Sequence, residues 1–400
     1  MQMFGGRPQG SPLHYNYRRR ESENNMAKKK ILIITSYVTG HGHKSVTNAI
    51  EDEIALRDDI EVKSIEGFSL AGQMGVKIGS LYAPIIRTSK DMWRFIYEVT
   101  CKRPGAVKTL VKRLIKRKFN RLIDEYKPDL ILTTHPTFTS AIIDLLREKK
   151  RKIPFAILFT DFISISPVWI DHRAQLTIAP TDMAKSFAER SGVSEDKIKI
   201  ISLPVRANIL KAARTIEKID EEKIRNKKEV DFLVMSGGDG SGNLGEIVER
   251  LLKIENSRIS VVTGRNTKLK EILDKRFDYF RDRVTIYGFV NDIENLLITH
   301  DIGITKAGAN AVIEAVNCCL PIIVAEMLPG QEEGNVDFLL RNNCGLYCNK
   351  NTSITKLVNK LLKDDKKRLI EIKKAQFELR DLDASKKVVN ELVNIMRRGK

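Results

Sequence analysis

Two neighbouring stretches of this chain indicate its fold: Ile31-Leu32-Ile33-Ile34-Thr35 and Thr39-Gly40-His41-Gly42-His43-Lys44-Ser45. The apolar run predicts a buried strand, the glycines predict a tight turn, and the pattern from Ser45 to Leu56 predicts a helix. α/β proteins use such a strand–turn–helix unit to present backbone N–H groups to a ligand. The turn also carries two imidazoles, which can move protons near neutral pH.

A second glycine-rich turn, Ser236-Gly237-Gly238-Asp239-Gly240-Ser241-Gly242-Asn243, follows the apolar strand pattern Val230–Met235. Its small residues allow close approach, and the helix that follows favours negative charge, so the turn suits a diphosphate. No Gly-Lys-Ser/Thr follows, which excludes a Walker A loop and leaves a plain tight turn as the alternative. Two such turns, half a chain apart, predict two facing nucleotide-fold domains with a reaction between them.

Strand and helix patterns alternate along both halves of the 400 residues, which predicts two α/β domains with parallel sheets. The expected strands are 30–36, 60–65, 129–133, 154–159 and 175–179, then 230–235, 258–263, 283–287, 301–305, 321–324 and 345–347. We expect a disordered tail at 1–27, an N-terminal Rossmann-like domain at 28–205, a linker at 206–228, a C-terminal Rossmann-like domain at 229–380, and a C-terminal helix at 381–400 that packs back on the N-terminal domain.

Composition predicts a soluble cytosolic protein, with 42% hydrophobic and 30% charged residues. No stretch approaches the ~18 apolar residues of a transmembrane helix. The five cysteines are spaced neither as metal ligands nor as a disulfide framework. His41 and His43 do not make a metal site by themselves, because no further Cys or His cluster completes one.

The net charge of +18 is concentrated in one window. Residues 87–121 contain twelve basic and two acidic residues, interleaved with Trp93, Phe95 and Tyr97. Basic residues beside exposed aromatics predict contact between residues 81–121 and an anionic membrane surface. Ordinary surface helices are the alternative. No nucleic-acid partner is expected, since the charge is confined to one window and no DNA- or RNA-binding motif is present.

The C-terminal half carries two further turns into helices. Thr305-Lys306-Ala307-Gly308-Ala309-Asn310 leads to Glu314, a carboxylate able to bind a ribose diol as in other nucleotide folds. Pro329-Gly330-Gln331-Glu332-Glu333-Gly334-Asn335 is dense in side chains that bind hydroxyl groups.

These motifs, in this order, resemble those of the monogalactosyldiacylglycerol synthase and processive diacylglycerol glucosyltransferase family. The family consists of inverting GT-B glycosyltransferases related to the peptidoglycan GlcNAc transferase. The similarity extends from Lys28 to about Asn390, and nine segments carry it in register. Besides the two glycine-rich turns, these are Thr133-Thr-His-Pro136, Thr160-Asp161 with Pro167-Val-Trp169, Leu203-Pro-Val-Arg206, Val262-Thr-Gly-Arg-Asn266, Tyr287-Gly-Phe-Val290, Thr305-Lys-Ala-Gly308 and Pro329–Asn335.

The resemblance implies an α/β, GT-B fold of two Rossmann-like domains, and a role for each matching residue. His43 matches the general base, and Asp161 is a second catalytic candidate that would orient His43 near the acceptor. The remaining candidates bind the nucleotide sugar: Gly42, Gly237, Gly238, Ser241, Arg265, Phe289, Val290, Lys306, Gly308, Glu314, Gln331, Glu332 and Asn335. The chain departs from the family pattern at Ala309-Asn310-Ala311, where a further glycine is usual, and at Ser166, where a histidine is common.

The resemblance further implies the reaction. A hexose would pass from UDP-glucose or UDP-galactose to diacylglycerol, with inversion, giving a β-glycosyldiacylglycerol. Neither a metal nor another cofactor is expected. The enzyme would be cytoplasmic and peripherally bound to the inner face of the cell membrane. Three alternatives stay open: a polyprenyl-diphosphate acceptor, a UDP-sugar epimerase, and a nucleotide-sugar-binding membrane regulator without turnover.

Overall fold

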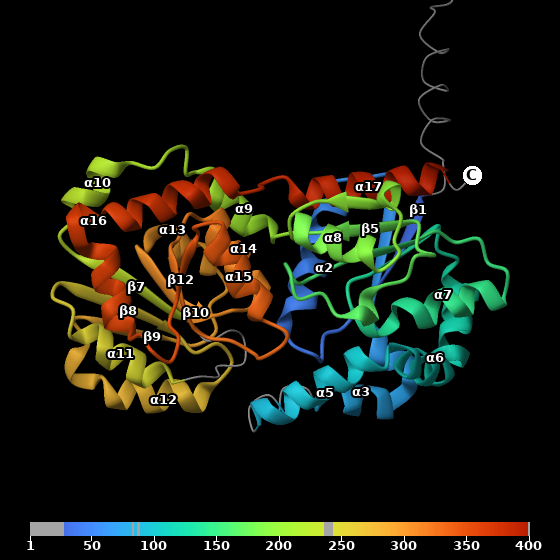
Figure 1. Cartoon of the computed structure of the whole chain (residues 1–400), viewed down its shortest axis with the longest axis horizontal. Helices are drawn as coiled ribbons and strands as arrows, with labels where there is room; N and C mark the ends of the chain where they lie inside the picture. Colours follow the sequence, from blue (N-terminus) through green and yellow to red (C-terminus); the bar gives the residue numbers. More distant parts are fainter. Residues whose placement is uncertain (1–27, 82–83, 86–88, 236–242, 399–400) are drawn as a thin grey trace, which may run out of the picture.

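The computed structural model describes residues 28–81, 84–85, 89–235 and 243–398, which form two α/β domains side by side (Figure 1). Within these residues each domain is built on one parallel sheet of six strands, with helices on both faces. Both sheets were expected from the alternating patterns, so the predicted fold class is confirmed.

The N-terminal sheet has the strand order β2-β1-β3-β4-β5-β6. Its first strand forms because Ile31 to Ile34 are apolar without interruption, and all four are fully buried between the flanking helices. The strands are β1 (Lys29–Thr35), β2 (Ile60–Glu66), β3 (Leu130–Thr133), β4 (Phe155–Leu158), β5 (Leu176–Ala179) and β6 (Ile198–Ile200). The helices are α2 (His41–Ile54), α3 (Gly72–Ser80), α5 (Lys90–Lys102), α6 (Pro104–Tyr126), α7 (Thr139–Glu148) and α8 (Asp182–Arg190), with short 3-10 turns η2 (Gly67–Ala71), η3 (Pro136–Phe138), η4 (Pro167–Trp169) and η5 (Glu195–Lys197).

The C-terminal sheet has the strand order β12-β11-β10-β7-β8-β9. The chain adds β8 and β9 on one side of β7, and then β10, β11 and β12 on the other, so the strand order reverses between β7 and β10. Ligands of such sheets bind outside the carboxyl ends of the strands at that reversal. The strands are β7 (Val230–Met235), β8 (Ser257–Val262), β9 (Val284–Tyr287), β10 (Ile302–Lys306), β11 (Ile322–Glu326) and β12 (Gly345–Tyr347). The helices are α11 (Leu244–Leu252), α12 (Thr267–Arg276), η6 (Asp278–Phe280), α13 (Ile293–Thr299), α14 (Ala309–Asn317) and α15 (Glu333–Arg341).

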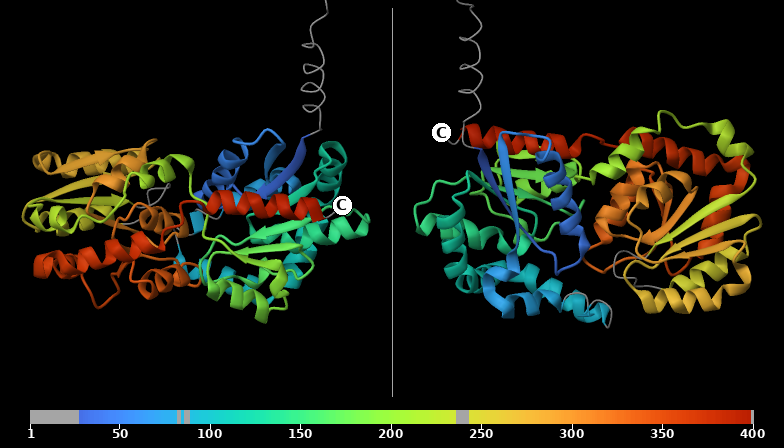
Figure 2. Two further views of the ribbon diagram at one scale, coloured as in Figure 1. Left: turned by 90° about the horizontal axis from the view of Figure 1, so that it is seen from above. Right: turned by 180° about the vertical axis from the view of Figure 1, so that it is seen from behind.

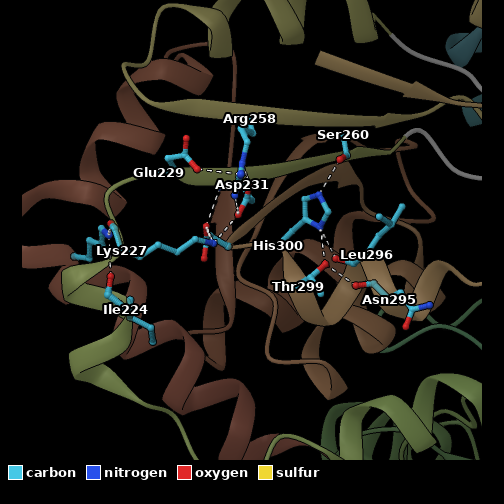
Figure 3. Close-up of polar contacts among 12 residues, drawn as sticks. Ile224, Lys227, Glu229, Asp231, Arg258, Ser260, Asn295, Leu296, Thr299 and His300 are labelled. Atoms are coloured by element: carbon cyan, nitrogen blue, oxygen red, sulfur yellow. Dashed lines mark hydrogen bonds and ion pairs between the residues drawn. The ribbon is translucent and has the colours of Figure 1, made fainter. Parts of the chain in front are cut away.

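A charged network holds the amino ends of this second sheet together (Figure 3). Lys227 donates to the carboxylates of Asp231 and Asp301, at 2.6 and 2.7 Å, and the backbone N–H of Asp231 donates to Asp301 at 2.8 Å. Arg258 on the neighbouring strand pairs with Asp231 at 2.7 Å. These contacts fix where β7, β8 and β10 begin.

Two connections join the domains. The segment predicted as a linker contains α9 (Ala207–Arg214) and α10 (Glu221–Asn226), and α9 contacts α2, α13 and α14. After α16 (Ile354–Leu379), the chain returns to the N-terminal domain as α17 (Ala384–Arg398), which packs on α2 (Figure 2). One buried apolar cluster runs through both domains and includes the Phe162 and Phe338 rings, which stack with centroids 4.0 Å apart.

Candidate active site

His43 lies in the first turn of α2, beside the carboxyl ends of β1 and β3. The chain enters this helix through Gly40, whose φ of 101° belongs to a region that only glycine adopts readily. The neighbouring rings are those of His135, with centroids 4.6 Å apart, and Trp169, at 6.5 Å. The imidazole therefore sits at the point where the N-terminal sheet reverses its strand order.

The hydrogen bonds of His43 determine its tautomer. Nδ1 lies 2.6 Å from the carbonyl oxygen of Thr134. Because a carbonyl oxygen can only accept, Nδ1 carries the hydrogen, and the lone pair belongs to Nε2. Burial lowers the pKa of His43 to about 4, against the opposing effect of the Thr134 carbonyl. The ring is therefore neutral at physiological pH, with Nε2 able to accept a proton.

His135, the adjacent histidine, is committed to the fold. Its Nδ1 accepts from the backbone N–H of Thr137 at 3.3 Å, so Nε2 carries the hydrogen and donates to the hydroxyl of Thr39 at 3.1 Å. Burial, assisted by the nearby His43, holds its pKa well below the usual value. Both ring nitrogens have partners, which makes His135 a structural support of the glycine-rich turn.

Buried threonine hydroxyls hold the backbone under His43. Thr35 at the end of β1 bonds to Thr47 of α2 at 3.0 Å and to Thr134 after β3 at 2.8 Å. Thr47 Oγ1 also lies 2.9 Å from the carbonyl oxygen of His43. Sequence reasoning missed this network, although the threonines at the ends of β1 and β3 were a visible signal.

Asp161, predicted to orient His43, follows β4 in a different environment. The orienting contact is made by the carbonyl of Thr134, with the hydroxyl of Thr160 at 3.3 Å from the same ring nitrogen. Burial, together with the charge of Glu332 across the domain boundary, raises the pKa of Asp161 to about 7. Asp161 therefore lies close enough to the loop Pro329–Asn335 for the charge of Glu332 to affect its ionisation.

The amino ends of α2 and α14 meet between the domains. Asn310 donates to the carbonyl oxygen of Gly42 at 2.8 Å, which gives a function to the residue that departs from the family pattern. Glu314, one turn further, accepts from the hydroxyl of Ser45 and lies 3.5 Å from Arg206. Burial raises the pKa of Glu314. The predicted ribose-binding acid thus lies beside the glycine-rich turn.

Four residues predicted to bind the nucleotide sugar lie at or after the ends of β10 and β11. Lys306 ends β10, and Gly308 precedes α14. A Cβ on Gly308 would lie at ordinary contact distance from Lys306 Cε (3.8 Å) and Glu332 Oε1 (3.9 Å), so these two side chains border the start of α14. Glu332 is buried and accepts from the backbone N–H of Leu328 at 2.9 Å, while its neighbour Gln331 is half-buried.

Asn335, predicted to bind the nucleotide sugar, forms hydrogen bonds in both domains. Its Nδ2 donates to the carbonyl oxygen of Ala307 at 2.9 Å, and its Oδ1 accepts from the backbone N–H of Phe162 at 3.2 Å. Only 1% of the residue is exposed. The adjacent Gly334 donates to the hydroxyl of Ser164 at 2.9 Å. The first turn of α15 is therefore hydrogen-bonded to the segment that follows β4 in the N-terminal domain.

Arg265, Phe289 and Val290, predicted to bind the nucleotide sugar, lie in the loops that follow β8 and β9. Arg265 and Phe289 are exposed and stack, with the guanidinium carbon 5.2 Å from the ring centroid, while Val290 is half-buried. Gly237, Gly238 and Ser241 lie outside the described residues. Within the described ranges, the His, Cys, Asp and Glu side chains form no group of three or more that could bind a metal ion.

The N-terminal domain also has an exposed apolar surface on α3, α5 and α6, which lie together along its lower edge in Figure 1. Phe95 of α5 is 68% exposed and Met74 of α3 is 71% exposed. The other exposed apolar residues of this α3–α5–α6 surface are Ile78, Leu81, Met92, Ile96, Val99, Leu110 and Leu114. Exposed basic residues accompany them: Lys77, Arg94, Lys102, Arg103, Arg113 and Arg117.

Part of the basic charge predicted for this surface is neutralised within the fold. Lys108 pairs with Asp144 of α7 at 3.0 Å, and Lys116 pairs with Glu148 at 3.1 Å. Among the described residues, no helix combines the length and the apolar character that crossing a membrane requires.

Comparison with known proteins identifies two family matches in succession. Residues 43–205 match the monogalactosyldiacylglycerol (MGDG) synthase family, and residues 232–388 match the glycosyltransferase family 28 C-terminal domain. The chain is 27% identical over 384 residues to a probable chloroplastic monogalactosyldiacylglycerol synthase of Glycine max, covering 92% of this chain and 72% of that protein. It is 25% identical over 376 residues to a processive diacylglycerol beta-glucosyltransferase of Bacillus licheniformis, covering 91% and 94%.

Among solved structures, MurG of Acinetobacter baumannii has the same fold, with a TM-score of 0.61 and 13% identity. The match covers 92% of this chain and 99% of MurG. The two facing parallel sheets are therefore those of the GT-B fold.

Proposed function

The chain belongs to the family of monogalactosyldiacylglycerol synthases and processive diacylglycerol glucosyltransferases, and from this premise we propose that it transfers a hexose from a UDP-sugar to diacylglycerol. The product would be a β-glycosyldiacylglycerol, formed with inversion and without a metal ion. The donor sugar would be glucose or galactose, since relatives named as galactosyl- and as glucosyltransferases both match over nearly the whole chain.

The main support for this proposal is the tautomer of His43 and its neutral charge. Its Nδ1–H is held by the carbonyl of Thr134, which leaves Nε2 as the acceptor for the proton of the lipid hydroxyl. As that proton leaves, the hydroxyl oxygen attacks the anomeric carbon from the face opposite the diphosphate. The negative charge of the donor raises the pKa of the imidazole in the ternary complex, which strengthens a base that is weak in the free enzyme.

The leaving diphosphate would bind where the C-terminal sheet reverses. The helices that follow β7 and β10, α11 and α14, begin on either side of this point, and their amino ends favour negative charge. Preorganised N–H donors at a leaving diphosphate are effective because they need no rearrangement during the reaction. Glu314 would bind the ribose, and Gln331 and Glu332 would bind the sugar hydroxyls.

The α3–α5–α6 surface would bind the membrane that contains the acceptor. Apolar side chains such as Phe95 can enter the lipid interface, and basic neighbours such as Arg94 are attracted to anionic lipid, at about 1 kcal/mol each. We therefore propose peripheral binding to the inner face of the cell membrane. A free diacylglycerol in that membrane would reach His43 from the N-terminal domain.

Radiolabel transfer tests the proposal. The protein would be incubated with labelled UDP-glucose or UDP-galactose and liposomes of diacylglycerol and anionic phospholipid, in the presence of EDTA. A labelled β-glycolipid from either donor supports the proposal and identifies the sugar. Failure of both donors, with or without added divalent cation, contradicts it, and transfer to a polyprenyl-diphosphate lipid would then redirect the acceptor assignment.

A further inference from the structure

Helix α5 has two different faces. Met92, Phe95 and Val99 are exposed and belong to the α3–α5–α6 surface. Trp93, Tyr97 and Cys101, spaced four residues apart, are half-buried on the opposite side. The first face has the character of a membrane-binding helix, and the second packs on the protein.

The inner face of α5 contacts the segment that follows β4. The hydroxyl of Tyr97 donates to the carbonyl oxygen of Ser164 at 3.4 Å, and Cys101 Sγ lies 3.3 Å from Ser166 Oγ. Ser166 begins η4, which contains Trp169 beside the His43 ring. Helix α5 therefore supports the acceptor side of the site.

Tyr97 also reaches across to the C-terminal domain. The ring lies against Gly330, where a Cβ would be 3.1 Å from Cδ1 of the tyrosine. Gly330 has a φ of +82°, which favours glycine, and it begins the loop with Gln331 and Glu332. Burial raises the pKa of the Tyr97 hydroxyl, which stays a donor to Ser164. The side chain of Tyr97 in α5 thus contacts both domains.

From this contact we infer that Tyr97 is a positioning residue, through which α5 on a membrane holds the loop Gly330–Asn335 in the conformation that binds the donor sugar. The inference rests on the proposed function, because it assigns the sugar to that loop. Coupling between two sites is reciprocal, so the donor must tighten membrane binding by the same factor as the membrane tightens donor binding. The uridine and phosphate groups bind elsewhere, and UDP alone should therefore show little coupling.

The test measures co-sedimentation with vesicles of equimolar phosphatidylglycerol and phosphatidylcholine, which lack diacylglycerol so that no transfer occurs. Binding is measured without nucleotide, with UDP, and with UDP-glucose or UDP-galactose. For the unaltered protein we expect the bound UDP-sugar to tighten vesicle binding at least about fivefold, the lower end of common coupling energies, and UDP to change it little.

Four variants separate a positioning role of Tyr97 from a general structural role. Tyr97→Ala should bind vesicles but lose the donor-dependent tightening, whereas Tyr97→Phe, which keeps the ring on Gly330, should retain it. Phe95→Ala, on the outer face of the same helix, should weaken vesicle binding yet keep the coupling factor. Gly330→Ala, which presses on the tyrosine from the other domain, should also lose the coupling. This variant serves as the second test if Tyr97→Ala does not fold.

Two results would overturn the inference alone: tightening that survives in Tyr97→Ala, or UDP-sugar binding without any tightening in the unaltered protein. A protein that binds neither UDP-sugar, with or without vesicles, would contradict the proposed function as well. Because donor binding is measured by calorimetry in the same samples, the two failures are distinguishable.

Discussion

Nδ1 of His43 donates to the carbonyl oxygen of Thr134 across 2.6 Å, and this contact decides which ring nitrogen can act as a base. The partner is a backbone atom, so the orientation of the imidazole depends on the end of β3 rather than on another titratable side chain. His43, the candidate base, thus lies where the strand order of the N-terminal sheet reverses, and buried hydroxyl groups hold the strand ends there.

The ionisation of His43 should be unusual and measurable. We expect a pKa of about 4 in the free enzyme, because burial disfavours the imidazolium. A ¹⁵N-detected NMR titration should show the Nδ1–H tautomer above that pH. The signal is assigned by its absence in His43→Ala. Titration of His43 near the ordinary value of about 6.5, or an Nε2–H tautomer, would contradict the geometry.

Removal of the Thr47 hydroxyl should destabilise the fold. Thr47→Val leaves buried polar groups of Thr35 and His43 with one partner fewer, which typically costs about 1–3 kcal/mol. Urea unfolding measures the loss. Thr299→Val is the matched control, because its hydroxyl bonds only within its own helix region near the surface and should change stability little. Equal effects of the two substitutions would refute the proposed support of His43.

Asp161 should make stability depend on pH. Its folded pKa of about 7 lies above the unfolded value near 3.8, so the folded state holds a proton that the unfolded state releases between these values. This contribution is fully present below pH 3.8 and is lost as pH rises through 7. Asp161→Asn, which cannot ionise, should therefore gain stability relative to the unaltered protein as pH rises from 4 to 8. A constant difference across that range would contradict the assignment.

The stacked rings Phe162 and Phe338 should couple the two domains. Their planes differ by 8°, and a double-mutant cycle with Leu at each position should give a coupling energy of about 0.5–1.5 kcal/mol. Leucine preserves most of the buried apolar area, so the cycle isolates the ring contact. Additive effects of the two substitutions in chemical denaturation would show that the rings contribute only through burial.

Most strands could be predicted because their apolar runs are buried on both sides, as in β1 and β7. The strand β6 was missed. Its sequence, Ile198-Lys199-Ile200, is short, and it lies at the edge of the sheet with two of its three residues exposed. An edge strand pairs with one neighbour only and buries fewer of its side chains, so its apolar sequence pattern is weak.

The sequence indicated in which loop each candidate residue lies, but not which residues of the other domain it contacts. Placing His43 in a turn required only the local sequence. The roles of Asn335 and Asn310 depend on contacts with Phe162 and Gly42, more than 170 residues away. The same reason explains the Tyr97 contact with Gly330, since no local pattern reports which loop a helix will meet.

We propose that His43 acts in the transfer step and not in donor binding. The most direct measurement compares His43→Ala with the unaltered protein for label transfer to diacylglycerol in anionic liposomes, alongside calorimetric binding of UDP. His172→Ala, an exposed histidine of the same domain, is the control. Only His43→Ala should lose about 10²–10⁴-fold in rate, with UDP affinity unchanged. Full activity of His43→Ala, or loss of UDP binding together with activity, would contradict it.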